Sequence, residues 1–330
     1  MIKPPAFWTS PTGAHHPAAI LLRPLSALYR IAVERKLRTA MPMAAACPVI
    51  CLGNISMGGV GKTPMADFLC DRLSTMGHRP FILMRGYGGK EPGPMRVKRE
   101  HQAADVGDEA VMQARRWPVI IARDRDMGAV AAVEQGADII VMDDGMQNPS
   151  LRKDLTLLMI DGKAGLGNGL VFPAGPLRES PNFAMTRADA VIVMGPLAED
   201  VPPDLPIAPE TPMIRASIRT VAPDLPVDQP VFAFCGIGRP EKFYEGLRAA
   251  GVTLTGTRSF ADHHPYTDED IQALHEAAGN AALVTTAKDL ARLKIEQRTG
   301  IAVADARLDV YDLPLLDSLL ARIGARTDLL

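Results

Sequence analysis

A glycine-rich loop constrains this chain more than any other feature of its sequence. The run Ser56-Met-Gly-Gly-Val-Gly-Lys-Thr63 follows a short apolar strand predicted at Pro48–Leu52 and opens a helix predicted from about Lys62 to Met76, which Gly77 ends. Glycines let successive backbone N–H groups turn inward around a phosphate, and the N-terminus of the following helix adds its positive dipole end. The pattern therefore predicts a nucleotide-binding phosphate loop.

Each position of this loop has an expected part in binding ATP and Mg²⁺. Lys62 should neutralise the β- and γ-phosphates, and the Thr63 hydroxyl should bind Mg²⁺. Two positions depart from the commonest pattern, because Ser56 stands where Gly is usual and Met57 stands where one variant of the loop has Lys. We expect the whole run to contact the nucleotide: Ser56, Met57, Gly58, Gly59, Val60, Gly61, Lys62 and Thr63.

Strands alternate with helices through the rest of the chain, which is typical of a parallel sheet with helices on both faces. After the phosphate loop, a first group of elements is predicted at Phe81–Met84, Val119–Ala122, Arg125–Gln135 (a helix), Asp138–Met142 and Leu155–Ile160. A second, smaller group is predicted at Val231–Cys235, Pro240–Ala250 (a helix), Asp268–Ala278 (a helix) and Leu283–Thr286.

The predicted fold is therefore α/β. It is a P-loop NTPase-type parallel sheet with helices on both faces, plus a smaller C-terminal α/β lobe and an N-terminal amphipathic helix. We divide the chain into a basic membrane-associating segment at 1–40, a P-loop kinase core at 41–220 and a smaller lobe that completes the active site at 221–330. Proline-rich stretches at 196–212 and 221–230 are predicted to be linkers or edge connections.

The first 40 residues form a basic segment. They hold six Lys or Arg and one acid, whereas the whole chain has a net charge of −2, which argues against a nucleic-acid partner. Apolar and basic residues recur at helical spacing from about Ala18 to Thr39. This spacing is typical of an amphipathic helix on an anionic membrane surface, and it fits equally a helix packed on the main domain. No run of 18 apolar residues predicts a bilayer-spanning segment.

Acidic pairs supply the partners that a phosphate loop needs. The apolar strand from Asp138 ends in Asp143-Asp144, and adjacent carboxylates repel each other unless a cation or a donor lies beside them. We therefore expect these two acids at the metal site. By itself, the pair Asp108-Glu109 fits the first turn of a helix that runs to about Trp117.

Seven motifs occur in one order along the chain and together resemble the tetraacyldisaccharide 4′-kinase family, the lipid A 4′-kinases of Gram-negative bacteria. The motifs are GNISMGGVGKTP (53–64), RGYGG (85–89), GDEA (107–110), DDGMQN (143–148), GNGLVFPAGPLRE (167–179), FADHHPY (260–266) and TTAKDLARL (285–293). The resemblance implies ATP-dependent phosphorylation of the 4′-hydroxyl of a tetraacylated glucosamine disaccharide 1-phosphate. It also implies a peripheral or monotopic protein at the cytoplasmic face of the bacterial inner membrane.

The resemblance also implies roles for single residues. Asp108 would be the base that accepts the proton of the acceptor hydroxyl, and His263 would orient or tune it, although His264 is the alternative in the same motif. Lys62 would act on the phosphates. The metal site would hold four residues: Thr63, Asp143, Asp144 and Glu109.

The region Asp161–Asn182 is rich in Gly and Pro and longer than most connections, which favours a functional loop. The resemblance implies that its stretch 165–179 is a loop on the acceptor side. Arg178, Asn168 and Gln147 are candidates for contacts with the sugar or its 1-phosphate, and a solvated Arg178 is the alternative. The chain departs from the family pattern at Asn148, where His is usual, and at Ala110, where Pro is usual.

Two other functions are compatible with a phosphate loop. One is a soluble ATP-dependent enzyme with a small-molecule acceptor. The other is a GTPase-like switch, which needs an N/T-K-x-D motif after a strand. Thr286-Ala-Lys-Asp289 has the wrong spacing for that motif, which argues against a switch.

Overall fold

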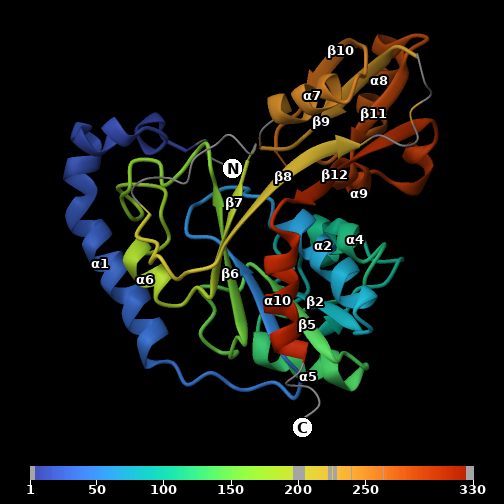
Figure 1. Cartoon of the computed structure of the whole chain (residues 1–330). Coiled ribbons are helices and arrows are strands. Elements are labelled where there is room, and N and C mark those ends of the chain that lie inside the picture. Colours follow the sequence, from blue (N-terminus) through green and yellow to red (C-terminus); the bar gives the residue numbers. More distant parts are fainter. Residues whose placement is uncertain are drawn as a thin grey trace.

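The computed structural model describes residues 4–195, 205–221, 225, 229–238, 240–262 and 264–324. Within these residues one sheet of 12 strands has the order β10-β9-β11-β12-β8-β7-β6-β1-β5-β2-β4-β3 (Figure 1). The strands are β1 (Val49–Gly53), β2 (Pro80–Met84), β3 (Met95–Arg96), β4 (Val119–Ile121), β5 (Ile139–Asp143), β6 (Leu155–Asp161), β7 (Ala190–Met194), β8 (Met213–Val221), β9 (Val231–Cys235), β10 (Leu254–Ser259), β11 (Ala282–Thr286) and β12 (Ile301–Val310).

Helices precede, connect and follow these strands. The α-helices are α1 (Pro17–Thr39), α2 (Lys62–Thr75), α3 (Ala103–Val106), α4 (Asp108–Gln113), α5 (Arg125–Glu134), α6 (Pro181–Met185), α7 (Pro240–Ala249), α8 (Asp268–Ala278), α9 (Ala287–Arg292) and α10 (Leu313–Gly324). The short 3-10 helices are η1 (Ala6–Trp8), η2 (Pro11–His15) and η3 (Ile295–Arg298).

The predicted α/β class is confirmed. The paired strands are parallel, except that β3 runs antiparallel to β4 and β8 antiparallel to β12. Strands β1, β2 and β5 are buried along their whole length, which explains why they appear in the sequence as unbroken apolar runs. Five strands were not predicted: β3, β7, β8, β10 and β12. Of these, β8, β10 and β12 are partly exposed and carry polar residues.

Strands β8 and β12 join two parts of the sheet. β8 pairs with β7 at one end and with β12 along most of its length, and it runs from one part of the molecule to the other in Figure 1. Separate apolar cores lie around each part. The predicted domain boundary at 221 falls at the end of β8, and it stays a prediction. The proline-rich stretches at 196–212 and 221–230 lie largely outside the described residues.

Helix α1 packs on the main domain along one face only. The Ser26 hydroxyl donates to the Val171 carbonyl, the Tyr29 ring meets Phe172 at 5.4 Å, and Ser180 donates to Glu34 at 2.5 Å. The opposite face carries five large apolar residues that are each 51–81% exposed: Ile20, Leu21, Leu25, Leu28 and Ile31. The helix therefore packs on the main domain, and its membrane association stays a prediction. Among the described helices, none is both long enough and apolar enough to cross a membrane.

The last helix completes the core around the phosphate loop. Leu316 and Leu320 of α10 are fully buried in the same apolar cluster as the inner face of α2. Arg72 of α2 donates to both carboxylate oxygens of Asp317 at 2.6 and 2.5 Å. The chain beyond the smaller lobe therefore returns to the first part of the sheet.

Truncating a buried leucine of α10 should destabilise the protein. We expect Leu320→Ala to lower the free energy of unfolding by about 2–5 kcal/mol, because it removes buried methyl groups and leaves a cavity. Leu315→Ala is the control on the same helix, since Leu315 is 36% exposed, and it should cost far less. Urea denaturation of both variants measures the difference, and equal losses would contradict the packing described above.

Candidate active site

The phosphate loop connects β1 to the start of α2. Gly61 lies at the N-cap of α2 with φ of 86°, and a Cβ there would come within 2.8 Å of the Ile218 side chain. Gly58 also has positive φ, at 148°. Position 59 is open, because a Cβ on Gly59 would meet no atom within 4 Å. Glycine is therefore favoured at 61 by the backbone conformation, and the loop can curve closely around an anion.

Lys62 turns back across its own loop. Its Nζ atom donates to Asn54 Oδ1 at 2.9 Å and lies 3.3 Å from Asp144 Oδ1. The amide nitrogen of Asn54 in turn donates to the Ser56 carbonyl at 2.6 Å. Asn54 is fully buried and thus fixes both the lysine and the start of the loop. Asn54 belongs to the motif GNISMGGVGKTP, but the sequence alone did not predict that it holds Lys62 and the start of the loop.

Asp143, at the end of β5, is a buried carboxylate beside other acids. Burial raises its pKa to about 7, and the negative charge of Glu109 adds to the shift while Lys62 opposes it. Its Oδ1 atom is buried and has no hydrogen-bond partner among the described residues. An unsatisfied carboxylate oxygen next to a second carboxylate is a suitable ligand for a cation.

Asp144 lies between two cations. It has φ of 53°, and its carboxylate accepts from Arg178 Nη1 at 2.9 Å while it faces Lys62. Burial opposes ionisation of Asp144, but Lys62 and Arg178 outweigh burial, so its pKa is lowered. The two predicted metal-site acids therefore differ, since Asp143 forms no ion pair with another described residue whereas Asp144 contacts two cations. This favours a role for Asp144 in holding Lys62 and Arg178.

The acids of α4 contact the smaller lobe. Asp108 and Glu109 are the first two residues of α4, and both pair with side chains of α9. Arg292 Nη2 lies 2.5 Å from Asp108 Oδ2, and Lys288 Nζ lies 2.5 Å from Glu109 Oε1. Asp108 is only 6% exposed. Lys288 and Arg292 belong to the TTAKDLARL motif, although no role was predicted for either.

The Gly- and Pro-rich loop lies directly against the phosphate loop. Met57 N donates to the Pro176 carbonyl at 2.8 Å, and Arg178 N donates to the Ile55 carbonyl at 2.7 Å. Gln147 joins the two, because its amide nitrogen donates to the Asn54 carbonyl at 3.0 Å. Arg178 and Gln147 therefore lie next to the phosphate loop. Their contact with the acceptor stays a prediction.

Three other motif residues have mainly structural contacts. Asn168 is 5% exposed and donates to the Ala174 carbonyl at 2.9 Å, so it shapes the loop, and a substrate contact for it stays a prediction. The side chain of Asn148 accepts from Ser150 N at 3.1 Å and forms a turn. His264 pairs with Asp270 at 2.9 Å. His263 lies outside the described residues.

The residues present fit a magnesium ion. Asp143, Glu109 and Thr63 carry oxygen atoms that would suit Mg²⁺, which is commonly held by one or two carboxylates together with substrate phosphates and water. Across the part of the chain that the structure describes, no group of three His, Cys, Asp or Glu converges on one point. A site with few protein ligands, completed by a nucleotide, is consistent with that finding.

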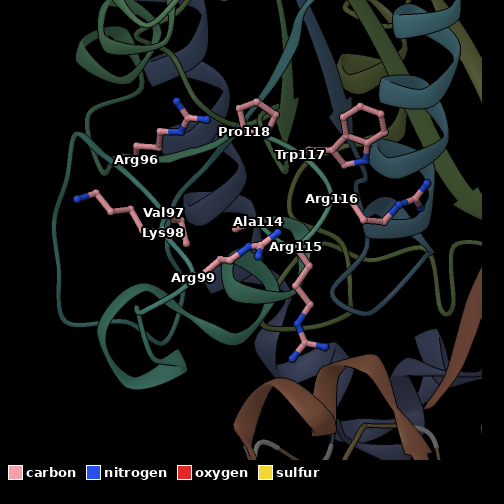
Figure 2. Close-up of a pocket in the computed structure, with 9 residues that line it drawn as sticks. All are labelled: Arg96, Val97, Lys98, Arg99, Ala114, Arg115, Arg116, Trp117 and Pro118. Atoms are coloured by element: carbon pink, nitrogen blue, oxygen red, sulfur yellow. The ribbon is translucent and has the colours of Figure 1, made fainter. Parts of the chain in front are cut away.

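A basic hollow of about 450 Å³ lies elsewhere, at the far end of α4 (Figure 2). It contains none of the predicted site residues. The edge strand β3 contributes Arg96, and the segment after α4 contributes Arg115 and Arg116. Charged side chains on an edge strand discourage pairing with another chain, which accounts for Arg96 without a ligand.

Comparisons with known proteins agree with this geometry. A family model described as Tetraacyldisaccharide-1-P 4'-kinase matches residues 18–324. A tetraacyldisaccharide 4'-kinase of Paramagnetospirillum magneticum is 46% identical over 98% of this chain and 100% of that protein. One of Methylobacterium radiotolerans is 47% identical over 94% of this chain and 95% of that protein.

The structure agrees as well. The crystal structure of an "apo" form of LpxK from Aquifex aeolicus in complex with ATP matches with a TM-score of 0.78 and 26% identity, over 93% of this chain and 99% of that chain. Sequence motifs, family model and fold coincide along nearly the whole chain. The chain belongs to the tetraacyldisaccharide-1-P 4'-kinase family.

Proposed function

We propose that this chain transfers the γ-phosphate of ATP to the 4′-hydroxyl of a tetraacylated glucosamine disaccharide 1-phosphate, a lipid A precursor. Family membership supports the activity, because curated relatives at 46% and 47% identity are named tetraacyldisaccharide 4'-kinase. The observation that carries the proposal is the approach of Lys62 to Asp144 at 3.3 Å beside the buried Asp143. A lysine of a phosphate loop beside strand-end acids is the arrangement that phosphoryl transfer uses.

In the proposed reaction the acceptor oxygen forms a bond to the γ-phosphorus, and the bond from that phosphorus to the bridging oxygen of ADP breaks. Asp108 would accept the hydroxyl proton, with His263 orienting it. Since phosphoryl transfer needs little covalent help, positioning and charge neutralisation carry most of the catalysis. The burial of Asp108 and its contact with Arg292 support this role, because both fix the carboxylate in one place.

Lys62 would exchange partners when ATP binds. In the structure it contacts Asn54 and Asp144, and both lie where the loop would curve around the phosphates. Asp144 would retain Arg178. Thr63, Asp143 and Glu109 would hold Mg²⁺, which neutralises charge on the phosphates when bound.

The acceptor would lie against the Gly- and Pro-rich loop. Arg178 and Gln147 are near the nucleotide loop, and a guanidinium fork suits a phosphate or a sugar hydroxyl. Helix α1 packs on the same loop through Val171 and Phe172. The exposed apolar face lies on the other side of the same helix, so a lipid on that face would be separated from the acceptor-side loop by α1 alone. This proximity favours an acylated acceptor over a small soluble one.

We also propose that the protein binds the cytoplasmic face of the inner membrane as a peripheral or monotopic protein. The exposed apolar residues of α1 share the helix with Arg23, Arg30 and Arg35. A helix with an apolar face and basic side chains lies in the interface of an anionic bilayer.

Removing the proposed base should stop the chemical step. We expect Asp108→Ala to lower turnover about 10²- to 10⁴-fold while ATP binding stays near normal, because the proton acceptor is lost and the phosphate loop is intact. Asp105→Asn, on the neighbouring helix α3, is the control. Transfer of radiolabelled phosphate and ATP titration measure both effects. Turnover near the wild-type value would remove Asp108 from the base role.

In metal-free protein, Asp143 should make stability fall as pH rises. Its pKa of about 7 in the folded protein exceeds the ~3.9 of an unfolded aspartate, so the folded state holds the extra proton between these values. This stabilisation is complete below the unfolded pKa and is lost as pH rises through 7. Relative to Asp143→Asn, we expect the wild type to lose roughly 2–3 kcal/mol of unfolding free energy between pH 5 and 8.5. Urea unfolding with EDTA tests this, and parallel pH profiles would contradict it.

Removing the apolar face of α1 should release the protein from lipid. We expect the triple change Leu21→Ser, Leu25→Ser, Leu28→Ser to lower partition onto anionic phospholipid vesicles at least tenfold, since about 0.8 kcal/mol is lost per buried CH₂. Ile295→Ser is the control, because Ile295 is 76% exposed but lies in the smaller lobe. Vesicle sedimentation measures the partition. Unchanged partition of the triple variant would rule out α1 as the membrane-binding element.

A further inference from the structure

Two cations of the smaller lobe pair with the two acids of the proposed catalytic site, and the proposed mechanism uses only the contact of one of them, Arg292, with Asp108. Lys288 and Arg292 are four residues apart on α9, so they lie on the same face of the helix. Their partners, Glu109 and Asp108, are consecutive at the start of α4. The two contacts differ in depth, because Arg292 is 6% exposed whereas Lys288 is 32% exposed.

Arg292 fixes one oxygen of Asp108. Its Nη2 and Nε atoms both donate to Asp108 Oδ2, at 2.5 and 3.2 Å. The other oxygen, Oδ1, accepts from Glu109 N at 3.0 Å within the first turn of α4. Both oxygens of the carboxylate are therefore held, and the plane of the carboxylate is fixed. An arginine fork gives this directional control, whereas a lysine ammonium acts as a point charge.

Arg292 is itself held by a buried network of the smaller lobe. Its Nη1 atom donates to the Gly236 carbonyl at 2.6 Å and to Asp289 Oδ1 at 3.0 Å. Asp289 is fully buried and also accepts from Tyr266 OH at 2.9 Å and Thr286 Oγ1 at 2.6 Å. The arginine thus cannot move without breaking its bonds to Gly236, which follows β9, and to Asp289, which Tyr266 and Thr286 hold in place.

This network includes residues of two motifs to which no role had been assigned individually. Tyr266 belongs to FADHHPY, and Asp289 and Arg292 belong to TTAKDLARL. Gly236 allows the close approach, because a Cβ there would lie 2.9 Å from the Ala261 carbonyl and 3.3 Å from Asp289 Oδ1. Buried polar networks that are fully hydrogen-bonded hold their members in one arrangement. Such a network suits a residue that must hold another side chain at a defined angle.

We infer that Arg292 is a positioning residue for Asp108, held by the Asp289 network, and that the smaller lobe thereby sets the geometry of the proton acceptor. The inference rests on the proposed role of Asp108 as the base. A purely structural salt bridge between lobes is the alternative. The two differ in what the loss of Arg292 changes: positioning affects the rate of transfer through Asp108, whereas a structural contact affects folding.

The test is a double-mutant cycle with a matched control. Arg292→Met and Arg292→Lys are made in the wild type, and Arg292→Met is also made in Asp108→Ala. Arg72→Met is the control, because Arg72 makes a comparable two-nitrogen contact with Asp317 away from the site. Single-turnover transfer from radiolabelled ATP to acylated disaccharide 1-phosphate measures the rate, and KM is measured for both substrates.

We expect Arg292→Met to lower kcat about 10²-fold, with KM for ATP changed less than about threefold, since misplacement of a catalytic group by about 1 Å has that effect on the rate. Arg292→Lys should recover part of the rate, and Arg72→Met should keep nearly all of it. In Asp108→Ala, adding Arg292→Met should cause no further loss. If Arg292→Met does not fold, an intermediate kcat for Arg292→Lys is the result expected in its place.

Two results would overturn the inference: wild-type kcat in the Arg292 variants, or an equal loss from Arg292→Met with and without Asp108. Failure of the proposed function looks different. If Asp108→Ala keeps most of its turnover, the base assignment fails and the inference fails with it. If Asp108→Ala is inactive while both Arg292 variants turn over normally, only the inference about Arg292 fails.

Discussion

Repulsion between carboxylates at one edge of the sheet is the constraint on which the site depends. Strand β5 ends in Asp143 and is followed by Asp144, α4 begins with two more acids, and the charge of Glu109 acts on the buried Asp143. Such a group is stable only if cations lie among its members. They come from the phosphate loop, the acceptor-side loop and the smaller lobe: Lys62, Arg178, Lys288 and Arg292. Ion pairs therefore hold the phosphate loop, the acceptor-side loop and the smaller lobe at the acids of the proposed active site.

Elements with a strong local signal could be predicted from the sequence. Strands β1 and β5 are buried on both faces, so they appear as apolar runs, and the glycines of the phosphate loop mark a backbone turn that other residues cannot make. Strand β8 could not be recognised in the same way. Parts of this strand face solvent between the two lobes and carry polar residues such as Arg215 and Arg219. These residues break the apolar pattern that marks a buried strand.

Partnerships in the site were less predictable than its members. Asp143 and Asp144 look alike in sequence, and only the fold gives one of them two cation partners and the other none among the described residues. Arg292 lies 184 residues from Asp108, so no spacing rule relates them. The motif TTAKDLARL, which contains Arg292, could be recognised in the sequence. The role of Arg292 could not, because it depends on α9 lying against α4 in the fold. Residue types thus indicate chemistry, whereas pairing has to come from the fold.

The position of α10 has a consequence for how the chain folds during synthesis. This helix follows the whole smaller lobe in the chain, yet Leu316 and Leu320 fill the cluster that covers the inner face of α2 beside the phosphate loop. During translation the first lobe emerges early, and that apolar face of α2 stays uncovered until the smaller lobe and α10 have been made. The ATP-binding core can therefore be completed only after the smaller lobe has been synthesised.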